Sequence, residues 1–153
     1  MQLLKTPLFL ASILALGSSA LKADVTLSNI FGDHMVLQRE QANPVWGKAD
    51  AGEQVTVSIG GQSHQTTANK QGIWRVKLDP MKASDQPQLL QVSGLKNHVT
   101  IADVLVGEVW ICSGQSNMQW ALTNTYNGAV EIASANHPQI RLISVPHVGT
   151  QEP

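Results

Sequence analysis

Short stretches of alternating apolar and polar residues, separated by turn signals, make up the sequence from residue 24 to residue 103. In residues 55–59, valine and isoleucine alternate with threonine and serine, which is the pattern of a strand with one buried face. Gly60-Gly61 then offers a two-residue hairpin turn into residues 62–68. With seven or eight such strands and no helical periodicity, residues 24–103 are predicted to form an antiparallel β-sandwich.

The other expected strands of this region are short and rich in β-branched residues. They are residues 25–27, 35–37, 45–48, 74–78, 90–92 and 99–101. Residues 80–87 are expected to form a loop. We expect Trp46 and Trp74 to be core residues, and the alternative is an aromatic platform that stacks on a sugar ring.

The composition restricts what the chain can bind. Lys and Arg number 10 against 11 Asp and Glu, without a basic stripe, so no nucleic-acid partner is expected. The five histidines are scattered, and paired cysteines and a His-Glu-x-x-His motif are both absent, so no metal site and no cofactor are predicted. The single cysteine, Cys112, lies in an apolar stretch and is expected to be buried and unreactive.

Residues 1–20 have the features of a secretory signal peptide. Lys5 gives a positive start, residues 8–16 are apolar, and Ser18-Ser19-Ala20 supplies small residues for cleavage after Ala20, with Ala23 as the second choice. The apolar run is shorter than the about 20 residues of a spanning helix, so no stable membrane span is expected after cleavage, and a membrane anchor is the alternative. We expect a secreted or periplasmic bacterial protein.

An apolar run, a sharp turn and a serine follow this β region. Residues 104–112 are almost wholly apolar, which is typical of a strand buried on both faces in a parallel sheet. Gly114 permits a tight turn, and Ser116 or Asn117 can cap a helix that begins near Met118. This order can present Ser116 as a nucleophile, with its own backbone N–H facing a developing oxyanion. The alternative is a plain turn with a serine cap, since Met118 replaces the second glycine of a Gly-x-Ser-x-Gly elbow.

A helix and a second strand are expected after this turn. Residues 129–135 favour a helix, and residues 140–145 favour a strand that is parallel to residues 104–112. Residues 104–153 are therefore expected to be the incomplete start of an α/β domain.

A long motif begins at Gly107. It reads Gly-Glu-Val-Trp-Ile-Cys-Ser-Gly-Gln-Ser-Asn-Met-Gln-Trp, and it closely resembles the first motif block of the sialate O-acetylesterase family, serine esterases of the SGNH hydrolase type. Residues 33–38 and 44–47 also resemble the N-terminal β domain of that family. The resemblance implies that the β-sandwich is followed by the truncated start of a flavodoxin-like, three-layer SGNH hydrolase domain at residues 104–153.

The resemblance also implies a chemistry. Ser116 would be the nucleophile of a carbohydrate O-acetyl ester hydrolase that works through an acyl-enzyme without metal or cofactor. Its partner would be an acetylated sugar, either 9-O-acetylated sialic acid or an acetylated polysaccharide. Such enzymes take their base from an Asp-x-x-His motif, and no aspartate of this sequence has a histidine three residues later. We therefore expect an N-terminal fragment that is inactive alone.

Other polar residues near this block have simpler interpretations. Ser113 is expected to be a turn residue, and His137 and His147 are expected to be exposed loop histidines rather than the base. The alternative function is a secreted carbohydrate-binding β-sandwich without catalysis, which leaves residues 114–118 unexplained.

Overall fold

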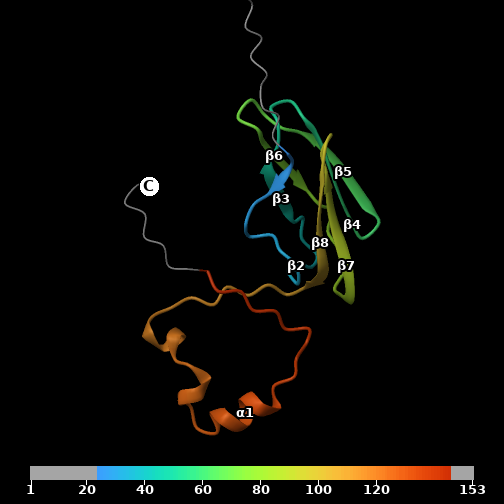
Figure 1. Cartoon of the computed structure of the whole chain (residues 1–153). Coiled ribbons are helices and arrows are strands. Elements are labelled where there is room, and N and C mark those ends of the chain that lie inside the picture. The colour runs from blue at the N-terminus through green and yellow to red at the C-terminus, as the bar shows by residue number, and fades with distance from the viewer. Residues whose placement is uncertain (1–23, 146–153) are drawn as a thin grey trace, which may run out of the picture.

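The computed structural model describes residues 24–145 and shows a chain that is mostly β-sheet with few helices (Figure 1). The predicted signal peptide at residues 1–20, with its cleavage site at Ala20 or Ala23, lies outside the described residues, as does His147. Among residues 24–145, no helix has the length and apolarity needed to span a bilayer.

Eight strands form two sheets in the described part of the chain. A three-stranded sheet has the order β1-β3-β6, and a five-stranded sheet has the order β2-β8-β7-β4-β5. Neighbours are antiparallel except β2 and β8, which pair in parallel. In chain order the strands are β1 (Thr26–Leu27), β2 (Val36–Gln38), β3 (Pro44–Lys48), β4 (Gln54–Ile59), β5 (Gln62–Thr67), β6 (Ile73–Lys77), β7 (Ser84–Ser93) and β8 (His98–Gly107).

The alternation in the sequence has the expected structural basis. In β4, Val55, Val57 and Ile59 are buried while the intervening residues are partly exposed. Gly60 and Gly61 form the predicted hairpin turn with φ of +58° and +80°, values that are open to glycine at no steric cost. The predicted loop at 80–87 is wrong from Ser84 onward, because β7 begins there through an irregular register with β8.

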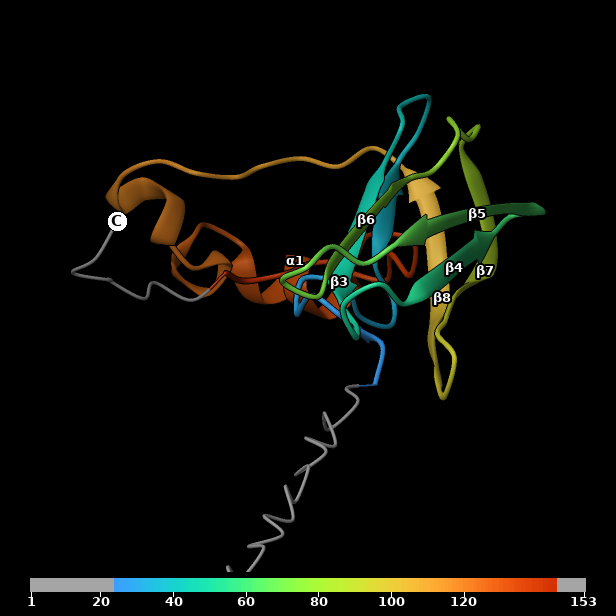
Figure 2. The same cartoon turned by 90° about the horizontal axis from the view of Figure 1, so that it is seen from above.

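One hydrophobic core joins the two sheets, which lie against each other in Figure 2. Trp74 of β6 is at its centre with 1% exposure, so the prediction of a core residue is confirmed there. Trp46 of β3 is only partly buried: Phe31 meets its ring edge-on at 4.8 Å, and Arg75 lies 5.5 Å from its ring centroid. Trp74 therefore offers no ring face to a sugar, whereas the partly exposed ring of Trp46 is in contact with Phe31 and Arg75.

Beyond β8 the chain leaves the sheets (Figure 1). It forms two short 3-10 helices, η1 (Ser116–Gln119) and η2 (Leu122–Asn124), and then the helix α1 (Gly128–Ser134). The helix expected at 129–135 is confirmed within one residue. The strand expected at 140–145 is wrong, since the described structure has no strand there and the residues are mostly exposed. Without a neighbouring strand to pair with, an apolar run has no ladder to join.

The strand expected at residues 104–112 is correct only in its first part. β8 ends at Gly107, so it crosses the predicted boundary between residues 103 and 104 and belongs to the five-stranded sheet. Val104, Leu105 and Val106 are buried there, whereas residues 108–112 are exposed. The division of the chain into domains stays a prediction.

Candidate functional site

Ser116 is the first residue of η1, and its side chain is exposed. The amide of Met118 donates to the carbonyl of Gln115 at 2.9 Å, and the amide of Trp120 donates to that of Asn117 at 3.2 Å. The predicted helix near Met118, capped by Ser116 or Asn117, is therefore wrong: the element is one 3-10 turn, and Gln115 precedes it without a side-chain cap. The dipoles of so few peptide units add up to little, so stabilisation of a developing oxyanion has to come from individual N–H groups.

The turn before Ser116 depends on Gly114. A Cβ atom at this position would lie 2.6 Å from Cγ of Met118, whose side chain folds back against the turn. Within residues 24–145, the hydroxyl of Ser116 makes no hydrogen bond. The structure thus presents an open serine on an exposed turn, a geometry that leaves the hydroxyl accessible to a base and to an ester.

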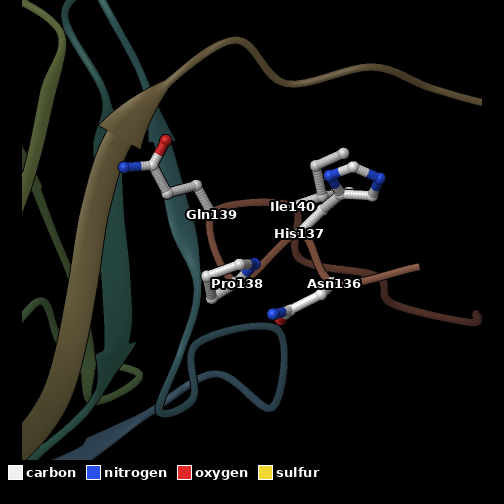
Figure 3. A pocket seen from close by; sticks show the side chains of 5 residues that line it. All are labelled: Asn136, His137, Pro138, Gln139 and Ile140. Atoms are coloured by element: carbon white, nitrogen blue, oxygen red, sulfur yellow. The ribbon is translucent and has the colours of Figure 1, made fainter. Parts of the chain in front are cut away.

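The other candidate catalytic residues considered from the sequence that lie in the described part of the chain are exposed as well. Cys112 is exposed, so its expected burial is wrong, and Ser113 is exposed as well. His137 lines a shallow pocket of about 410 Å³ together with Asn136, Pro138, Gln139 and Ile140, and Ser116 is not among the lining residues (Figure 3). No cluster of His, Cys, Asp and Glu that could hold a metal occurs between residues 24 and 145.

Sequence reasoning missed a cluster of side chains at the point where the chain leaves β8. Arg39 Nε donates to Glu108 Oε1 at 2.6 Å, and Gln38 Nε2 donates to Glu108 Oε2 at 3.0 Å. The amide of Val109 donates in turn to Gln38 Oε1 at 2.8 Å. The hydrogen bond from Gln38, followed by that from Arg39, lowers the pKa of Glu108 below its ordinary value. The start of the segment that carries Ser116 is thereby fixed to the sheets.

A second cluster ties the far end of this segment back to β8. The Asp103 carboxylate contacts His34 Nδ1 at 2.5 Å and accepts from Arg141 Nη2 at 2.9 Å. His34 and Asp103 both have left-handed backbones, with φ of +66° and +53°, conformations that are uncommon outside glycine. The hydrogen bond with His34 is the largest of the causes that lower the pKa of Asp103. Residues 108–141 therefore leave the sheets at the end of β8 and are tied back to the same strand.

The lowered pKa of Asp103 predicts an acid-sensitive contribution to stability. Because its folded-state pKa lies below the unfolded value of about 3.9, the contribution is complete above that pH and disappears as the pH falls through the folded pKa. Unfolding by urea between pH 6 and pH 2 should show a shallower acid loss in Asp103→Asn than in the unmodified chain. Asp24→Asn, at an exposed position, is the control; an equal acid loss in the unmodified chain and in Asp103→Asn would contradict the prediction.

Comparison with known proteins shows similarity to sialate O-acetylesterases. It is 35% identical over 132 residues to the sialate O-acetylesterase of Mus musculus, covering 78% of this chain and 24% of that protein. The sialate O-acetylesterase of Homo sapiens is 32% identical over 137 residues, covering 82% and 26%. No family model matches the chain.

A solved structure agrees with these relatives. The crystal structure of a carbohydrate acetylesterase from Xanthomonas citri matches with 37% sequence identity and a TM-score of 0.72, covering 75% of this chain and 26% of that one. The chain thus spans about a quarter of the length of the proteins that it resembles.

Proposed function

Since the chain belongs to the sialate O-acetylesterase family and spans about a quarter of the length of its relatives there, we propose that it carries the nucleophile segment of a carbohydrate O-acetylesterase. The observation that carries the proposal is the similarity to sialate O-acetylesterases and to a carbohydrate acetylesterase at 32–37% identity. Two further features support it: the motif around Ser116 and the open position of its hydroxyl on η1. The substrate class is an acetylated sugar, either sialic acid or a polysaccharide.

The proposed reaction is acyl transfer through Ser116. Its Oγ attacks the acetyl carbonyl carbon as a base takes the hydroxyl proton, and the backbone N–H of Ser116 donates to the oxyanion. The sugar oxygen leaves with a proton, and water then hydrolyses the acetyl-serine ester. The base remains to be supplied, because the 153 residues contain no Asp-x-x-His sequence. Neither metal nor cofactor takes part in these steps.

The same family supports a finer proposal on architecture, and the N-terminal sequence supports one on location. We assign the residues from 24 to the end of β8 at Gly107 to a β-sandwich domain and the residues that follow to the start of an SGNH-type α/β domain. Residues 1–20 are proposed to direct export, which would place the protein in the periplasm or outside a bacterial cell.

Labelling with a fluorophosphonate, a reagent that phosphonylates nucleophilic serines, tests the role of Ser116. Because the base is missing, only slow modification is expected in the purified chain. The backbone N–H of Ser116, the proposed oxyanion donor, should still direct it to this serine, and Ser116→Ala should abolish it in the mass spectrum. The matched control is Ser113→Ala, three residues away and also exposed, which should leave labelling unchanged. Modification at Ser113, or evenly over the surface serines, would contradict the assignment.

The missing base predicts little acetate release by the 153 residues alone. Loss of a base leaves roughly 10³–10⁴-fold acceleration over water only where the oxyanion hole and substrate binding survive. Incubation with acetylated xylan and with 9-O-acetylated sialic acid, followed by enzymatic assay of acetate, should give a rate close to the blank. Acetate release well above the blank that Ser116→Ala removes would show that a base is present after all.

A further inference from the structure

Two distant stretches of the chain lie side by side over their whole length. Residues 33–39 accompany residues 102–109: β2 pairs in parallel with the end of β8, from Val36 opposite Leu105 to Gln38 opposite Gly107. Hydrogen bonds extend this pairing at both ends, since the amide of Ala102 donates to Asp33 Oδ1 at 2.6 Å and the amide of Arg39 donates to the Gly107 carbonyl at 2.8 Å. The end of β8, which precedes the Ser116 segment, is therefore held in place by residues 33–39.

This pairing ends in side-chain contacts with Glu108. Both oxygens of this carboxylate are engaged, one by Arg39 and the other by Gln38, and Gln38 also accepts from the amide of Val109. From residue 109 to residue 120 every residue is exposed. The direction in which the chain leaves the sheets is thus set at Glu108.

We propose that Glu108, held by Gln38 and Arg39, is a positioning residue that fixes the path of the segment bearing Ser116. Ser116 follows Glu108 by eight residues, and each residue extends the reach by at most about 3.3–3.6 Å, so an anchor at Glu108 limits the space open to the hydroxyl. Misplacing a reacting group by about 1 Å can cost 10²-fold in rate. The effect of Glu108 on catalysis rests on the proposed role of Ser116. The experiment that tests the anchor measures the mobility of the segment and not esterase activity.

The single cysteine provides the probe. Cys112 is exposed, four residues after Glu108 and four before Ser116, so a nitroxide label can be attached to the full chain without an engineered site. In the electron paramagnetic resonance spectrum, Glu108→Ala and Arg39→Ala should increase the mobile fraction of the label severalfold. Arg39→Lys, which retains a cation able to reach the carboxylate, should keep the spectrum of the unmodified chain.

The matched control is Glu131→Ala, which removes an exposed carboxylate of α1 and should leave the spectrum unchanged. Far-UV circular dichroism shows whether each variant keeps its sheets. Spectra of folded Glu108→Ala and Arg39→Ala that match the control would overturn the proposal, and so would a failure of Arg39→Lys to restore order. Neither result depends on whether Ser116 is a nucleophile.

An acid titration of the labelled, otherwise unmodified chain tests the same contact without a substitution. Among the described residues, Arg39 is the charged group that faces Glu108, and the pKa of Glu108 lies below its ordinary value of 4.5. The mobile fraction should stay constant down to about pH 4.5 and grow below it while the circular dichroism is still that of the folded sheets. Growth that begins above this pH, or only as the circular dichroism is lost, would overturn the proposal.

Discussion

Replacing Trp74 with alanine is expected to lower the free energy of unfolding by about 3–5 kcal/mol. Trp74 has 1% exposure and is the largest fully buried side chain of the core between the two sheets. Its removal leaves a cavity lined by residues of strands that cannot collapse inward without breaking their ladders. Urea unfolding followed by circular dichroism measures the loss.

Trp74→Phe is the matched control, for a reason that the structure supplies. The indole Nε1 of Trp74 is buried, and no hydrogen-bond partner for it exists among residues 24–145. Phenylalanine fills most of the volume and removes this unsatisfied donor, whose burial costs about 1–3 kcal/mol. Its loss of stability should be clearly smaller than that of alanine, and equal losses would show that packing around Trp74 is not the cause.

The second large loss in the free energy of unfolding is expected from adding one methyl group at Gly47. A Cβ atom there would lie 1.8 Å from the carbonyl oxygen of Thr26 and 2.8 Å from Cζ2 of Trp74. Because the first obstacle is the backbone of β1, Gly47→Ala has to push that strand away from β3. Overpacking costs about 1–3 kcal/mol and occasionally more, and we expect the upper end of that range.

Gly32→Ala is the control for this second substitution. A Cβ atom at Gly32 meets nothing within 4 Å, so the same chemical change should leave the free energy of unfolding nearly unchanged. Comparable losses at Gly32 and Gly47 would contradict the contact with Thr26 as the cause, because the effect of Gly→Ala on the unfolded chain is stabilising at both positions.

The strands were predictable where each has one buried face. In residues 55–59 the alternation is a local signal, and it reports which side chains meet the core. The start of β7 was missed because residues 84–88 are polar apart from Pro87 and join a strand only through their partner in β8. The apolar run at 104–112 was misjudged beyond Gly107, since apolarity alone does not reveal whether a residue has a neighbour to pack against.

The candidate site was likewise predictable only in part. The motif placed Ser116 on a turn after an apolar strand, which describes the chain order correctly, but the length and type of the following helix depend on packing that the sequence does not display. The contacts of Glu108 with Gln38 and Arg39 join side chains that are separated in the sequence by 70 and 69 positions. A usable signal did exist: residues 33–38 and the motif from Gly107 both resembled the same family, although nothing in either one showed that they touch.

The central position of β8 has a consequence for how the protein is made. In the five-stranded sheet, β8 lies between β2 and β7, and β2 has no other strand partner. During synthesis the β4–β5 hairpin can form as soon as it emerges, whereas β2 waits for residues about 70 positions downstream. Until then, the open side of β7 is an unprotected strand edge available to other nascent chains. A gene cut after the codon for Asp103 would keep the pairing of β7 with residues 98–101 but leave β2 without its partner, residues 105–107, and the start of β7 unpaired. A soluble recombinant sheet domain therefore has to extend through Glu108.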